Sequence, residues 1–288
     1  MEGGKAVKRW SSFLVYGWAI LTFGLFFAVV IGEAAAWAFP EWKYTEKIVQ
    51  AIAMSALIIP VTFYLYQQWY RNIDQDDTKV YVFASFFHML TGLLFPIGLA
   101  VVSLLVMNAF DWIDLGNWQF PGTWLGVFVL NLCIALLYEA LPEEIIMRGF
   151  IYDVLRHKLP VWISVLMQAF IFLAFSAGTT LLLVLAELSP LTNLMMLPFE
   201  LILHFFFAIA LALFRVWTKS LWASIGFHLG YLMVARFIIH SKTYGVPAIV
   251  AYQNNIAPGF GESLLTIAII PGTIGILLVL LLVRRFKK

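Results

Sequence analysis

The chain has 288 residues, of which 62% are hydrophobic and only 12% are charged, and its formal net charge is +2. A soluble domain carries about twice that share of charged residues, so the composition excludes an ordinary soluble protein. The basic residues are dispersed at helix ends instead of forming a patch, so no nucleic-acid partner is expected.

Apolar runs long enough to cross a bilayer recur along the whole sequence, since a membrane helix needs about 20 mostly apolar residues. They predict an all-α integral membrane protein, a bundle of about eight transmembrane helices. Residues 141–158 carry several charges and are predicted to form a short amphipathic helix on the cytoplasmic side. The predicted spans are 11–38, 47–68, 80–107, 123–140, 161–187, 190–214, 220–240 and 263–283.

Lysine and arginine set the orientation, because they are enriched in the cytoplasmic connections of membrane proteins. With the N-terminus inside, only Lys43, Lys47, Arg236 and Lys242 fall on the outer side. The asymmetry favours both termini in the cytoplasm and fits a plasma membrane. The residues on the inner side are Lys5, Lys8, Arg9, Arg71, Lys79, Arg148, Arg156, Lys158, Arg215, Lys219, Arg284, Arg285, Lys287 and Lys288.

Ionisable side chains at membrane depth are costly and therefore indicate function, and the densest cluster lies at 139–148. Pro142 suits the first turn of a helix, where its missing N–H is not needed, so we predict a helix break and a new start there. Glu143 and Glu144 would then occupy a first turn, where the helix dipole favours negative charge.

Helical spacing separates the two glutamates of this cluster. Glu144 and Arg148 are four residues apart, so they lie on one face and can pair. Glu143 is offset by about 100° and has no such partner on its own helix. A nearby Glu139 carboxylate would make Glu143 a stronger base, which is typical of a general base beside a paired neighbour. A capped helix start with an ordinary ion pair also explains these residues.

Two histidines inside predicted spans are further candidates. His228 lies in the seventh span with Tyr231 one turn away, and Glu200 and His204 are four apart in the sixth, where they could pair. Structural packing also accounts for each histidine. The sequence contains no His-Glu-x-x-His and no Cys/His grid, so it implies neither a metal nor another cofactor. The single cysteine, Cys133, lies in an apolar run and is expected to be a buried thiol.

The run Glu143-Glu144-Ile-Ile-Met-Arg148 resembles the Glu-Glu-x-x-x-Arg motif of the CPBP family. This family comprises intramembrane proteases, namely the type II CAAX prenyl endopeptidases and the bacteriocin-processing (Abi) proteins. The run 220–231, which contains His228, resembles the last motif of the family. The resemblance implies a catalytic core at 125–240, with the helices of 1–110 packing around it in a single polytopic domain over 1–288.

The resemblance also implies roles for these residues. Glu143 would activate a water molecule, Glu144 and Arg148 would support it, and His228 would hold the water or stabilise the oxyanion. The implied function is a glutamate-dependent intramembrane endopeptidase that cleaves a membrane-associated peptide or protein near the cytoplasmic face of the bilayer.

Two positions depart from the family motifs. Ser176 stands where the second motif has a histidine, and Leu232 stands where the third has Asn or Asp. A serine hydroxyl can still hold a water molecule and aid His228, whereas leucine cannot. On helical spacing, we hypothesise that Tyr231 replaces the polar group missing at Leu232 and that His204 fills the gap at Ser176.

These departures leave a second interpretation open, in which the chain is a weak or inactive family member that acts as a regulator, an immunity factor or a scaffold. A third interpretation is a transporter with a carboxylate–histidine relay. The sequence shows no repeat between its halves, which counts against a transporter.

Overall fold

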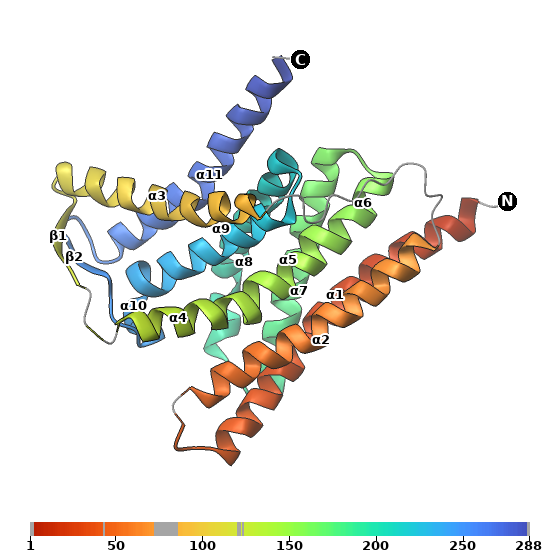
Figure 1. Ribbon diagram of the computed structural model, residues 1–288, viewed down its shortest axis with the longest axis horizontal. Helices are drawn as coiled ribbons and strands as arrows, with labels where there is room; N and C mark the ends of the chain where they lie inside the picture. The colour runs from red at the N-terminus through yellow and green to blue at the C-terminus, as the bar shows by residue number, and fades with distance from the viewer. Residues whose placement is uncertain (1–2, 43, 72–85, 120–121, 123, 287–288) are drawn as a thin grey trace. The chain divides into compact units, whose positions relative to one another are not determined.

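The structure is a computed structural model, and it describes residues 3–42, 44–71, 86–119, 122 and 124–286 (Figure 1). This part of the chain is mostly helical, and eight of its helices are long and apolar enough to cross a membrane. The all-α, multi-pass membrane architecture is therefore confirmed, although the predicted start of the third span lies outside the described residues. The eight spans are Trp10–Ala38, Thr45–Tyr70, Phe87–Ala109, Trp124–Lys158, Val161–Leu185, Thr192–Thr218, Leu221–Ile239 and Phe260–Phe286.

The chain divides into two compact units, each assembled from separate stretches of sequence. Unit 1 comprises Met1–Val82 and Leu137–Ala212, and unit 2 comprises Phe83–Leu136 and Leu213–Lys288. The glutamate cluster belongs to unit 1, and His228 belongs to unit 2.

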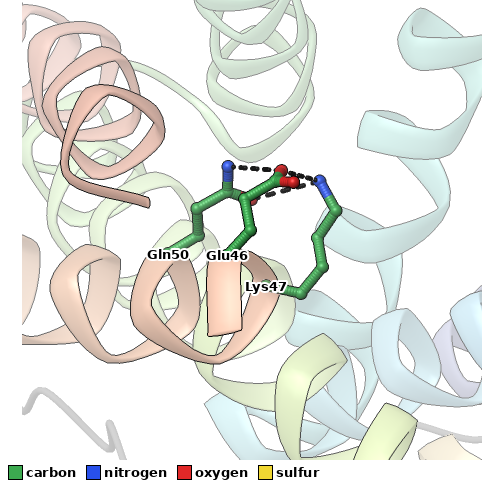
Figure 2. A network of polar contacts seen from close by, with 3 residues as sticks. All are labelled: Glu46, Lys47 and Gln50. Atoms are coloured by element: carbon green, nitrogen blue, oxygen red, sulfur yellow. Dashed lines mark hydrogen bonds and ion pairs between the residues drawn. The ribbon is translucent and has the colours of Figure 1, made fainter. Parts of the chain in front are cut away.

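A hairpin of two long helices, α1 (Gly3–Ala38) and α2 (Thr45–Tyr70), forms one side of unit 1, and the two lie side by side in Figure 1. Small residues allow the close packing, because a Cβ atom at Gly24 would lie 2.2 Å from the Ile58 side chain. At the start of α2, the Glu46 carboxylate accepts hydrogen bonds from Lys47 at 2.6 Å and from Gln50 at 3.0 Å (Figure 2).

The α1–α2 hairpin packs on a segment that carries the glutamate cluster and is helical throughout. Its parts are α5 (Leu141–Glu144), η3 (Ile145–Ile151) and α6 (Tyr152–Lys158). Unit 1 is completed by α7 (Val161–Leu185) and by α8 (Thr192–Thr218) as far as Ala212. Aromatic rings fill the core of the unit, and Phe150 makes edge-on contacts with the rings of Phe13, Tyr66 and Trp69.

The predicted break at Pro142 is wrong, because the helix runs without interruption over 35 residues, from Trp124 to Lys158. The π-helical segment η2 (Leu136–Ala140) lies directly before Pro142, and η3, which is also π-helical, follows Glu144. In a membrane, local π geometry and Ser or Thr side chains satisfy backbone groups that a proline frees. The Ser55 hydroxyl on α2 does so here by donating to the Leu137 carbonyl.

Residues 141–158 are helical as predicted, but they continue the span Trp124–Lys158 instead of forming a separate short helix. Every residue of η3 is buried, and so are Tyr152, Val154 and Leu155 of α6. On α6, the Asp153 carboxylate accepts a hydrogen bond from the Tyr66 hydroxyl at 3.0 Å. Packing by α1, α2 and α7 therefore turns a segment with an amphipathic sequence into a buried one.

In unit 2, the closest helix pair is α3 (Phe87–Ala109) with α9 (Leu221–Val234). A Cβ atom at Gly92 would lie 2.1 Å from the Ala223 carbonyl oxygen, and one at Gly226 would lie 2.1 Å from that of Met89. The two backbones can approach this closely only because glycine has no side chain.

The remaining elements of unit 2 surround this pair. They are α4 (Trp124–Ala135), η4 (Ala235–Ile239), α10 (Ser241–Tyr244), α11 (Phe260–Phe286) and the strands β1 (Ile113–Trp118) and β2 (Val250–Asn254). The strands lie in connections between spans and pair antiparallel, with Ile113 opposite Asn254. Cys133 on α4 is exposed, so the prediction of a buried thiol is wrong. An apolar run in a membrane protein can face lipid as well as protein, and its residues are then exposed on the protein surface.

Candidate functional site

The candidate residues of unit 1 are centred on a buried ion pair. Arg148 Nη1 donates to Glu144 Oε1 at 2.9 Å, and both side chains are 0% exposed. The pairing predicted from the spacing of four residues is thus confirmed. A charge pair removed from water in this way holds its geometry, since either partner alone would be a costly buried charge.

Glu143 is buried beside this pair but is not part of it. Its side chain is 7% exposed, and no described residue donates a hydrogen bond to its carboxylate. The charges that act on it are those of Glu139, Arg148 and Glu144. Two of these are negative and one is positive, and the positive charge is already bonded to Glu144. Glu143 is therefore the buried carboxylate of the cluster that remains available to a substrate or a water molecule.

A chain of contacts leads from the ion pair across α7 to α8. The Arg148 guanidinium lies 4.7 Å from the centre of the Phe172 ring. The Phe172 ring meets the His204 ring edge-on, with centroids 6.0 Å apart and planes at 83°. Ser176, one turn after Phe172, places its Oγ 2.9 Å from His204 Nδ1. His204 therefore contacts the side chain at position 176, and its replacement of the motif histidine stays a prediction.

Gln168 is a residue of this site that the sequence reasoning missed. It lies one turn before Phe172 on α7, its side chain is 0% exposed, and neither its amide nitrogen nor its amide oxygen has a partner among the described residues. Arg148 Nε and Nη2 also lack an acceptor there. Ser164, Gln168 and Ser176 lie at multiples of four on α7, and this spacing could have revealed its polar face.

In unit 2, the candidate residue is His228 on α9. This side chain is 3% exposed. Gly226 and Gly230, which lie two residues on either side, both pack against the backbone of α3. Two residues correspond to about 200° of helical rotation, so His228 points away from α3. The close packing of the glycines thus fixes the direction of the imidazole.

The other residues named from the sequence differ in burial. Glu139 and Tyr231 are half-buried, whereas Leu232 is 7% exposed and contributes only an apolar side chain. Glu200 is exposed. Within the described ranges, no three His, Cys, Asp or Glu side chains are grouped so as to hold a metal ion.

Comparison with known proteins gives a match to one family. Residues 123–234 match the family model of the type II CAAX prenyl endopeptidase Rce1-like proteins. Comparison with curated proteins and with solved structures gives no match. The matched segment contains Glu143, the Glu144–Arg148 pair, Ser176 and His228. In residues 123–234, the chain is thus similar to the type II CAAX prenyl endopeptidases.

Proposed function

We propose that this protein is an active intramembrane endopeptidase in which Glu143 is the general base. The observation that carries the proposal is the buried Glu144–Arg148 pair, which leaves Glu143 as the unbonded carboxylate beside it. A general base needs an oxygen that no donor already occupies, and a carboxylate without a hydrogen-bond donor has one. Glu143 would take a proton from water as the water oxygen attacks a peptide carbonyl.

His228 would stabilise the oxyanion that forms in this attack. A donor fixed in direction and screened from water is most effective in that role. The packing of Gly226 and Gly230 on α3 supports this assignment, because it holds the His228 side chain in one orientation. The mechanism requires Glu143 and His228 to act on the same substrate group, and Tyr231 would supply the polar group that Leu232 lacks.

The substrate would be a membrane-associated peptide or protein, reached from the cytoplasmic face of a plasma membrane with both termini inside. The family description adds a lipidated C-terminal segment as the first substrate to test. The experiment compares cleavage of a fluorogenic prenylated peptide by the wild type and by Glu143→Gln in detergent. We expect the variant to lose activity on the order of 10²-fold or more. Equal rates would refute the role of Glu143.

Ser176 and Leu232 favour a second candidate function, that of an inactive relative which binds a membrane peptide or partner as a regulator, an immunity factor or a scaffold. In that case, the wild type would show no turnover, and the double substitution Ser176→His with Leu232→Asn would create it. Robust turnover by the wild type would exclude this second candidate.

A further inference from the structure

The contact between Ser176 and His204 places an imidazole in unit 1, which contains only one other histidine. That residue, His157, lies at the end of α6, where its ring packs edge-on against Trp69 at 6.2 Å. His204, in contrast, is joined through Phe172 to Arg148 and hence to the glutamate cluster. Imidazole is the side chain whose ordinary pKa lies closest to neutrality. Of the two histidines of unit 1, His204 is therefore the one that ring contacts connect to the Glu144–Arg148 pair.

Peptide cleavage needs such a proton donor. When Glu143 takes a proton from water, the water oxygen bonds to the carbonyl carbon and gives a tetrahedral oxyanion. Collapse of this intermediate breaks the C–N bond, and the leaving nitrogen must receive a proton at the same time. Glu143 then holds the proton from water, and a second group that is already protonated can serve the leaving nitrogen while Glu143 faces the water.

We propose that His204 is a catalytic residue which protonates the leaving nitrogen and that Ser176 is its positioning residue; this inference rests on the proposed peptidase function. The imidazolium of His204 gives its proton to the nitrogen as the C–N bond breaks, and it becomes neutral. The proton held by Glu143 then returns through water to His204. The net change is one peptide bond and one water molecule converted into one carboxylic acid and one amine.

A serine hydroxyl suits this positioning role because it can both donate and accept. It accepts from Nδ1–H when the imidazole is charged, and it donates to Nδ1 when the imidazole is neutral. The 2.9 Å contact can therefore persist through the whole cycle. A second support is the Phe172 ring, whose edge-on contact limits rotation of the imidazole. Both supports come from α7, one turn apart, and they hold a histidine of α8.

The test uses the full chain in detergent and a fluorogenic prenylated peptide. His204→Gln keeps a group that can hydrogen-bond to Ser176 but cannot act as an acid, so it should remain folded. We expect kcat to fall on the order of 10²-fold with little change in KM. Ser176→Ala should lower kcat by about 10-fold, as loss of an orienting partner does. The matched control is His157→Gln, which should cleave at the wild-type rate.

Exchanging Ser176 and His204 shows whether the imidazole acts in catalysis or only makes a structural contact. Ser176→His combined with His204→Ser moves the imidazole from α8 to α7 across the same hydrogen bond. We expect this double variant to cleave well above the rate of His204→Gln. A folded His204→Gln variant that cleaves like the wild type, or an exchanged variant no faster than His204→Gln, would overturn the proposal while the role of Glu143 stands. A wild type without turnover would instead refute the proposed function, and with it the role of His204.

Discussion

Arg148 and Glu144 are bonded at 2.9 Å with neither side chain exposed, and this pair separates the two adjacent glutamates into different roles. Glu144 is neutralised by the arginine, while Glu143 is buried without a hydrogen bond from any described residue. The same guanidinium lies over Phe172, so the pair also connects η3 to α7. We therefore expect both the stability and the proposed chemistry of unit 1 to depend on this arginine.

Arg148→Met should destabilise the protein strongly, because it leaves Glu144 as an uncompensated buried charge. The expected loss is about 3–5 kcal/mol, measured as unfolding in detergent by circular dichroism. Glu144→Leu combined with Arg148→Met should recover most of that stability, since an apolar pair of similar volume can replace a buried ion pair.

The double variant should still fail to cleave peptide, because it removes the positive charge that acts on Glu143. Recovery of stability without activity would separate the structural role of the pair from its support of Glu143. A double variant as unstable as Arg148→Met would show that the loss comes from packing around Phe172 and not from the unpaired charge.

Gly92→Ala should weaken the contact between α3 and α9, because its Cβ would lie 2.1 Å from the Ala223 carbonyl oxygen. Overpacking of this kind costs about 1–3 kcal/mol. Gly98→Ala on the same helix is the matched control, since its Cβ would meet nothing within 4 Å among the described residues. Thermal unfolding of both variants in detergent measures the difference. Equal stability would mean that the two helices do not pack through Gly92.

The eight spans could be predicted because each depends only on a long apolar run, which the sequence displays directly. The Glu144–Arg148 pair could be predicted for a similar reason, as a spacing of four residues places two side chains together on any helix. The roles of Glu143 and His228 stay predictions, because they concern chemistry that a fold alone does not test.

Other features depend on contacts between distant segments, and sequence reasoning failed there. Pro142 looked like a helix break because the rule comes from helices in water, whereas here the π-helical geometry of η2 and the Ser55 hydroxyl accommodate it. The burial of α6 depends on α1, α2 and α7. The pairing of β1 with β2 joins segments more than a hundred residues apart, and neither strand is long enough to predict alone.

The variant Gln168→Leu should show whether the buried amide on α7 serves peptide cleavage or only the stability of the fold. Both amide atoms lack a partner among the described residues, and a buried polar group without a partner costs about 1–3 kcal/mol. A leucine of similar size removes this cost, so the melting temperature should stay equal or rise. Peptide cleavage should fall, because we expect the amide to bind the polar backbone of the substrate beside Arg148. An unchanged cleavage rate at equal or higher stability would make Gln168 a structural residue.

A disulfide cross-link can test whether Glu143 and His228 act on one substrate group, as the mechanism requires. The chain has a single cysteine, so Cys133→Ser gives a cysteine-free background. Glu143→Cys and His228→Cys are then introduced together and oxidised in detergent. A disulfide needs Cα atoms within about 7 Å, and a short bis-maleimide reaches somewhat further, so graded linkers bracket the distance.

We expect the short bis-maleimide to link the pair within one chain, shown by a peptide that joins both segments after proteolysis. The single-cysteine variants are the controls for links between chains. A monofunctional maleimide checks that both cysteines react. If they react but no linker joins them, the two residues lie too far apart to share a substrate. Glu143 would then need an oxyanion partner other than His228.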